Sequence, residues 1–226
     1  MAKRSKRYLE SRKLVDSDKK YDLKESIKLL KSFKPAKFDE SVEVAMKLGI
    51  DPKQSDQLIR GSVSLPKGIG KSLKVVVFAA GEKAEFAKRA GADEVGAEEL
   101  VKKVEGGWVD FDVAIATSDM MKLVGKLGRV LGPQGKMPSP KSGTVTDDIE
   151  TAVKEFKAGK IEYRTDAGAN VHAIVGRKSF SEADLEDNIN AFVKHITNSR
   201  PPSAKGIFVQ NVSVSSTMSP GIMVKI

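Results

Sequence analysis

The chain has 226 residues, 40% of them apolar, with 39 Lys/Arg against 30 Asp/Glu and a formal net charge of +9. So high an apolar fraction supplies buried cores and excludes a disordered basic tail. The absence of cysteine excludes disulfides and thiolate metal sites, and no apolar run reaches the ~18 residues of a membrane-spanning helix. The composition predicts a folded protein of the reducing cytoplasm, without metal, cofactor or membrane contact.

The positive charge is unevenly distributed along the chain. Residues 1–34 carry 12 Lys/Arg against 5 Asp/Glu, and residues 160–226 carry 8 against 6. Residues 35–67 and 68–159 are neutral, with 5 against 5 and 14 against 14. Because clustered positive charge attracts polyanions, we expect a nucleic acid to bind near the two ends of the chain. A protein with basic ends and no such partner is the alternative.

The first elements along the chain are predicted to be helices followed by a strand. A basic helix extends to about Val15, and Asp22 with Glu25 forms a capping-box pattern ahead of a second helix. Pro35 ends that helix. Residues 41–48 alternate strictly between apolar and polar side chains, which predicts a strand with one buried and one polar face.

The middle of the chain alternates strands with helices. Apolar runs at 73–79 and 111–117 predict strands buried on both faces, with a short strand near Val95 between them. The glycine- and proline-rich stretch 128–143 is expected to lack regular structure. This alternation indicates βαβ units and a parallel sheet. Helices are expected at residues 82–89, 98–104, 119–127 and 147–157.

After the middle segment the strictly alternating pattern returns. Residues 161–165 and 171–176 are predicted to pair as a hairpin. Ser181 is expected to cap an amphipathic helix. Two further alternating strands are expected at residues 208–215 and 222–226, the first with serines on its polar face.

These patterns predict two domains, one α+β and one α/β. Residues 1–67 and 160–226 are expected to form a discontinuous, sandwich-like α+β domain, into which residues 68–159 insert a Rossmann-like α/β domain. The strand pattern and the charge balance change at the same positions. Glycines at both connections favour a hinge. The alternative is a single domain with one long mixed sheet.

Two glycine–lysine stretches resemble phosphate-binding loops, but neither fulfils the motif. The motif needs a glycine five residues ahead of its Gly-Lys-Ser/Thr. Gly70-Lys71-Ser72 has Leu65 at that position, and Gly135-Lys136 has Val130. We therefore predict no nucleotide site, although a nucleotide-dependent enzyme built on the inserted domain remains an alternative by fold analogy.

No catalytic constellation appears in the sequence. His172 lies in an alternating strand and His195 on the flank of a helix, each without a nearby acid and nucleophile pattern, so both are interpreted as structural. Asp147-Asp148 is interpreted as an acidic pair at a helix N-terminus and Trp108 as a packing residue. The sequence therefore predicts that the protein is not an enzyme.

The segment 131–143, Leu-Gly-Pro-Gln-Gly-Lys-Met-Pro-Ser-Pro-Lys-Ser-Gly, closely resembles the signature of the ribosomal protein L-one family, bacterial type. The similarity continues in residues 38–44, 61–66, 91–93 and 216–220, in the same order. The resemblance implies two domains, the second inserted into the first. It also implies a non-enzymatic constituent of the large ribosomal subunit in the cytoplasm, monomeric when free.

The resemblance further implies that the discontinuous domain binds a structured site on large-subunit rRNA. Small hydroxyl side chains would let the RNA backbone approach and would bond its 2′-hydroxyls. Cations would attract phosphates, and a carboxylate would accept from a 2′-hydroxyl or an amine. The family usually has glycine at position 219, where a side chain is costly if φ must be positive. The expected RNA-binding residues are Lys37, Phe38, Ser41, Glu43, Arg164, Ser213, Ser215, Thr217, Met218 and Ser219.

Family membership would also bring biological roles. These proteins form the mobile stalk beside the ribosomal exit site, assist the release of deacylated exit-site tRNA, and in many cases repress translation of their own operon mRNA. The glycine-rich loop of the inserted domain is expected to make a second contact with tRNA or rRNA, through Lys126, Arg129, Lys136 and Lys141. A protein that coats DNA nonspecifically is a further alternative.

Overall fold

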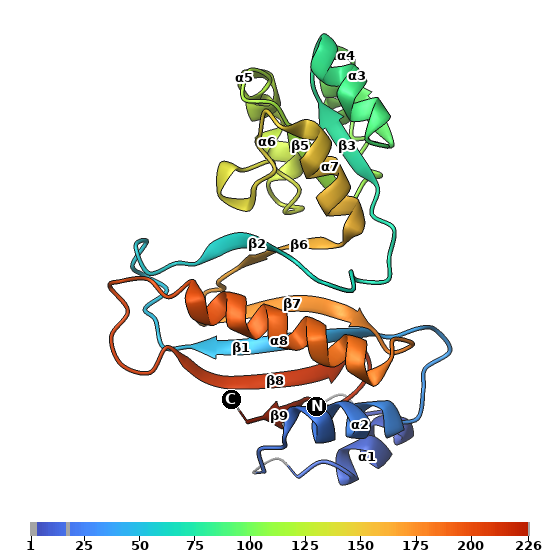
Figure 1. Cartoon of the computed structure of the whole chain (residues 1–226), viewed down its shortest axis with the longest axis vertical. Helices are drawn as coiled ribbons and strands as arrows, with labels where there is room; N and C mark the ends of the chain where they lie inside the picture. Colours follow the sequence, from blue (N-terminus) through green and yellow to red (C-terminus); the bar gives the residue numbers. More distant parts are fainter. Residues whose placement is uncertain (1–3, 17–18, 226) are drawn as a thin grey trace. The chain divides into compact units, whose positions relative to one another are not determined.

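A computed structural model describes residues 4–16 and 19–225 of the chain, which has the predicted mixed α/β composition (Figure 1). The chain forms two compact units. Unit 1 comprises Met1–Gly70 and Ile161–Ile226, and unit 2 comprises Lys71–Lys160. Within the described residues, no helix is long and apolar enough to span a bilayer.

Unit 1 is built on a four-stranded sheet in the order β7-β1-β8-β9, with antiparallel neighbours throughout. The strand predicted over 41–48 is confirmed as β1, and it pairs on both sides. The predicted strand 222–226 is present as far as residue 224, and Ile226 lies outside the described residues. The strands are β1 (Ser41–Leu48), β7 (Asn170–Arg177), β8 (Val209–Ser216) and β9 (Ile222–Val224).

Helices pack on one face of this sheet. α2 (Leu23–Ser32) contacts α8 (Glu182–Asn198), β8 and β9, and α8 also packs on β7 (Figure 1). The basic N-terminal helix is confirmed as α1 (Lys6–Lys13), and residues 1–3 lie outside the described part. The face below the helices is apolar, and the central strand contributes to it Val42, Val44, Met46 and Leu48, each at most 1% exposed.

The two predicted helix caps differ in outcome. Ser181 caps α8, because its hydroxyl accepts from the amide of Asp184 at 3.1 Å. Asp22 is the N-cap residue of α2, but its side chain makes no capping bond. Its carboxylate instead faces Lys225 at 3.5 Å, so the predicted capping box is wrong.

The hairpin predicted for 161–165 and 171–176 is also wrong. β6 (Lys160–Arg164) pairs with β2 (Arg60–Ser64), a strand that the sequence pattern missed, and β7 pairs with β1. The turn between β6 and β7 does form, and one bridge joins Thr165 to Val171. Beyond this turn the two strands pair with different neighbours. An alternating pattern predicts a strand and its buried face but not the strand beside it, so the sequence did not show this pairing.

Unit 2 contains a three-stranded parallel sheet in the order β4-β3-β5. Alternate side chains of β3 enter two separate cores. Val76 and Phe78 pack with α4 and the helices after β5, while Val75 and Val77 pack with α3 and α7. Both faces are therefore covered, as the apolar runs predict. The elements are β3 (Val75–Phe78), α3 (Glu82–Arg89), β4 (Glu94–Gly96), α4 (Glu98–Glu105), β5 (Val113–Ala116), α5 (Met121–Val124), α6 (Gly128–Leu131) and α7 (Ile149–Ala158).

The stretch 128–143 is more regular than its composition suggests. Its first four residues form α6, and Pro140–Ser142 form a 3₁₀ turn, so the prediction of no regular structure is wrong. Leu127 and Leu131 lie four residues apart and are both fully buried in the core of unit 2. Burying two leucines outweighs the cost of about 1 kcal/mol for one glycine in a helix.

Candidate nucleic-acid interface

The sheet of unit 1 has a second face that the helices do not cover, here called the open face. Glu43 on β1 lies between Ile174 on β7 and Ser215 on β8. Two residues further along β1, Ala45 lies between His172 and Ser213. The residues of β1 and β8 on this face are half-buried, as expected on the uncovered face of a sheet.

The turn after β8 is fastened to the first residue of β1. The amide of Ser41 donates to Oγ1 of Thr217 at 3.0 Å, and the amide of Thr217 donates to the carbonyl of Ser41 at 3.0 Å. Arg177 at the end of β7 donates to Oγ of Ser41 at 3.0 Å from the other side. This end of the open face therefore joins three strand ends.

Ser219 closes its own turn. Its Oγ accepts from the amide of Ser216 at 2.9 Å, and its amide donates to the Ser216 carbonyl at 3.0 Å. Among the described non-glycine residues only Ala169 has positive φ. Position 219 therefore imposes no backbone strain on a serine, and the hydroxyl supplies a hydrogen bond that a glycine would lack.

Two apolar side chains extend into solvent at this end of the open face. Phe38, in the loop before β1, is 53% exposed, and Met218, in the turn after β8, is 50% exposed. Lys37 beside Phe38 is also exposed. Exposed apolar groups close to hydroxyls and a cation suit the faces and edges of nucleotides.

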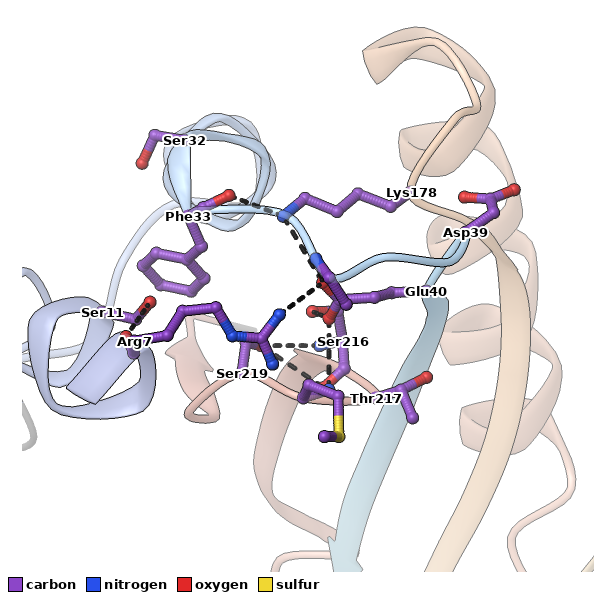
Figure 2. A network of polar contacts seen from close by, with 12 residues as sticks. Arg7, Ser11, Ser32, Phe33, Asp39, Glu40, Lys178, Ser216, Thr217 and Ser219 are labelled. Atoms are coloured by element: carbon purple, nitrogen blue, oxygen red, sulfur yellow. Dashed lines mark hydrogen bonds and ion pairs between the residues drawn. The ribbon is translucent and has the colours of Figure 1, made fainter. Parts of the chain in front are cut away.

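A buried carboxylate holds the two segments together (Figure 2). Glu40 is 2% exposed and receives hydrogen bonds from the amide of Ala36, the hydroxyl of Ser216 and the amide of Met218. Burial alone would raise the pKa of Glu40, but these hydrogen bonds and the charge of Lys178 outweigh it and leave the pKa below its ordinary value. Glu40 is therefore ionised at neutral pH.

The predicted RNA-binding residues fall into one main group. Nine of them lie on β1, on β8 or in the two segments flanking this end of the sheet, at the positions given above. Arg164 is the exception, because it ends β6 in the two-stranded sheet. Its neighbour Thr165 accepts from the amide of Ile59 and bridges to Val171, which connects β6 to the start of β7.

Sequence reasoning missed several residues of the open face. His172 and Ile174 point outward from β7, Met223 does so from β9, and Arg177 bonds Ser41. Glu40 was also missed, although a signal was present. Glu40 lies two residues before Val42, so it continues the series of inward-facing positions of β1. A polar side chain at an inward-facing position needs hydrogen-bond or ion-pair partners.

The two histidines behave differently. His195 on α8 lies 2.9 Å from the hydroxyl of the buried Tyr163, so its interpretation as structural is confirmed. The side chain of His172 is 59% exposed on the open face, with Nε2 at 3.5 Å from Asp166. Within residues 4–16 and 19–225, no three His, Asp or Glu side chains are arranged to hold a metal ion.

The cations predicted for the second contact do not share one environment. Lys126, Arg129 and Lys141 are exposed. Lys136 is half-buried, where its ammonium donates to the carbonyl of Val109 at 2.9 Å and lies 5.2 Å from the ring centroid of Phe111. Lys136 therefore supports the fold of its own loop.

Two other features of unit 2 match their interpretation as structural. Trp108 packs at 5.5 Å from Phe111, with the ammonium of Lys103 at 4.0 Å from its ring. Asp148 caps α7 by accepting from the amide of Thr151 at 3.3 Å. The neighbouring Asp147 pairs with Lys83 at 2.7 Å, which lowers the pKa of its carboxyl.

These features define a class: a basic mixed α/β protein whose candidate surface is an open sheet face lined by hydroxyls, suited to a nucleic acid. The model of the Ribosomal protein L1p/L10e family matches residues 30–220. The chain is also 55% identical over 222 residues to "Large ribosomal subunit protein uL1" of Kosmotoga olearia. The aligned region covers 98% of this chain and 96% of that protein. The chain therefore belongs to the Ribosomal protein L1p/L10e family. Both the predicted family and the prediction of a non-enzymatic protein are confirmed.

Proposed function

We propose that this protein is a constituent of the large ribosomal subunit that binds large-subunit rRNA through the open face of unit 1. The observation that carries the proposal is the arrangement of Ser41, Ser213, Ser215 and the 217–219 turn along one sheet face that no helix covers. Small hydroxyls on a flat surface suit the 2′-hydroxyl-rich minor groove of folded RNA. The name of the Kosmotoga relative and the family match support the same assignment.

Each proposed contact residue has a chemical role. Lys37 and Arg164 attract phosphates, and Phe38 and Met218 pack against ribose or a base face. The carboxylate of Glu43 repels phosphates, so it weakens nonspecific binding to a polyanion, and it accepts a hydrogen bond from a suitably placed 2′-hydroxyl or exocyclic amine. The exposed groups of His172 and Ile174 extend the surface across β7.

The test is the double variant Thr217→Val/Met218→Ala. It removes one hydroxyl and one exposed apolar contact, and we expect binding to a large-subunit rRNA fragment to weaken by about 2 kcal/mol, roughly 30-fold. Calorimetry or filter binding at fixed salt measures this change. The matched control is Thr197→Val/Phe86→Ala, two exposed positions on α8 and α3 that are not part of the open face, and it should bind like the unchanged protein. Equal affinities for both variants would contradict the assignment.

We also propose the finer roles of the family for this chain. Residues 1–67 and 160–226 are the discontinuous α+β domain, and residues 68–159 are the inserted Rossmann-like domain. The two compact units and the covered parallel sheet of unit 2 support this division. The stalk so formed assists release of exit-site tRNA and represses the protein's own operon mRNA, and the free protein is a monomer. The exposed Lys126, Arg129 and Lys141 are the proposed second contact for tRNA or rRNA, and Lys136 supports their loop.

A further inference from the structure

The segment before β1 and the turn after β8 are 176 residues apart in sequence, yet both carry proposed RNA-contact residues. We propose that Glu40 is a positioning residue for RNA binding. Its buried carboxylate fixes these two segments as one preformed surface, so that Phe38 and Met218 meet the RNA together. The inference rests on the proposed rRNA-binding function and adds a group that does not touch the RNA.

The burial of Glu40 separates it from the surface that it organises. It is 2% exposed, whereas Phe38 and Met218 are half exposed. A carboxylate buried to this extent is costly unless hydrogen bonds and opposite charges compensate it. The side chain therefore acts through its protein partners.

Each oxygen of the carboxylate binds a different segment. Oε1 accepts from the amide of Ala36 at 3.0 Å, in the loop that leads to Phe38. Oε2 accepts from Oγ of Ser216 at 2.7 Å and from the amide of Met218 at 3.1 Å. One rigid group thus spans the two segments and orients the turn that presents Met218.

Two cations complete the surroundings of Glu40. The ammonium of Lys178, after β7, lies 4.0 Å from Oε1 and donates to the carbonyl of Phe33 at 2.7 Å. The guanidinium of Arg7 on α1 lies 3.9 Å from Oε1 (Figure 2). Together with the two backbone amides and the Ser216 hydroxyl, these two cations make five groups around the carboxylate, all of them hydrogen-bond donors or cations. A neutral amide in place of the carboxylate must therefore point an N–H at another donor.

The physical consequence is preorganisation. Ordering two separate segments when RNA binds would reduce the affinity, because backbone and side-chain freedom is lost at that moment. Because Glu40 already fixes the two segments in the folded protein, they do not have to be ordered when the RNA binds. The mutual bonds of Ser41 and Thr217 then extend the same fixed geometry onto the open face.

The test is Glu40→Gln in the full chain, with Kd measured for the rRNA fragment well below the unfolding temperature. We expect a loss of at least tenfold, together with faster hydrogen exchange at the Met218 amide and unchanged exchange in the β1–β7 pairing. Ser216→Ala is the milder second variant, because it removes one of the three hydrogen bonds to Glu40, and it should lose about threefold to fivefold.

Two controls separate positioning from loss of stability. Ile189→Val removes one methylene from the core beneath α8, and Asp184→Asn makes the same acid-to-amide change in the first turn of α8, on the side of the sheet opposite the open face. Both should keep the Kd within twofold. A thermodynamic cycle then places Glu40→Gln in the Thr217→Val/Met218→Ala background. If Glu40 acts through the turn, its effect there falls to threefold or less.

The outcomes distinguish the inference from the function on which it rests. If the unchanged protein fails to bind the rRNA fragment, the proposed function is wrong. If it binds and the Thr217→Val/Met218→Ala variant weakens binding, but Glu40→Gln and Ser216→Ala do not, the positioning role is overturned. Full additivity in the cycle, or an equal loss in Ile189→Val, overturns it as well.

Discussion

The four-stranded sheet of unit 1 and the three-stranded sheet of unit 2 are covered differently, and the difference decides which sheet face is open to a ligand. The four-stranded sheet of unit 1 has helices on one face, and its other face carries half-buried hydroxyls together with the exposed His172 and Ile174. The sheet of unit 2 has cores on both faces. Unit 1 can therefore offer a sheet face to RNA, whereas the sheet of unit 2 has no face free for one.

The charged side chains of the two units also have different kinds of partner. In unit 2 many charged side chains are paired with each other, so the neutral middle of the sequence corresponds to surface ion pairs. These include Lys71–Asp112, Lys74–Asp110, Lys83–Asp147 and Lys103–Glu94. In unit 1 the cations near the open face bond backbone and hydroxyl groups, as Arg177 does with Ser41. Much of the charge of unit 2 is therefore neutralised within the unit, although each exposed pair adds little to its stability.

The largest expected effect on stability tests whether the two units unfold separately. Gly49 follows β1, and a Cβ there would lie 2.2 Å from the carbonyl oxygen of Ile207. Gly49→Ala should lower the free energy of unfolding of unit 1 by about 2–3 kcal/mol, because backbone must move. Circular dichroism should show an early transition, while the fluorescence of Trp108, the single tryptophan, in unit 2, keeps its midpoint.

The control for this variant is Gly128→Ala in unit 2, where a Cβ would meet nothing within 4 Å and the residue is helical. It should leave the first transition unchanged and raise the second slightly. If Gly49→Ala lowers both midpoints equally, the two units unfold as one and the comparison between them fails for stability.

A smaller effect concerns pH. Hydrogen bonds from the backbone and side chain of Asn170, and from the amide of Gly168, lower the pKa of Asp166 to about 2. The folded state therefore favours the carboxylate, and this stabilisation is complete above pH ~4 and lost as the pH falls towards 2. Urea midpoints from pH 6 to 2 should show less acid sensitivity in Asp166→Asn. A carboxyl titration at the ordinary value of about 3.8 would contradict this account of the turn.

Much of the fold follows from local sequence patterns. The strict alternation of 41–48 and 208–215 predicts which side chains lie on the open face, because the period of a strand is two. The apolar runs likewise predict a sheet covered on both faces. Such patterns encode the orientation of side chains, which depends only on nearby residues.

Strand partners and buried polar contacts could not be predicted in this way. The pairing of β6 with β2 depends on chain segments about 100 residues apart, and alternation carries no information about it. The bond between Glu40 and Ser216 joins two polar residues that each continue the buried phase of a strand. The sequence shows that both must find partners but not that they find each other.

The most direct measurement of the central claim is rRNA affinity after the open face is blocked. Ser213 lies opposite Ala45 and Met223 in the middle of this face. Ser213→Phe should place a ring where RNA would lie and weaken binding at least 100-fold, while Asn190→Phe, on the exposed side of α8, stays within threefold. Equal affinity of both variants for the rRNA fragment, with both proteins folded, would contradict the claim that the open face binds RNA.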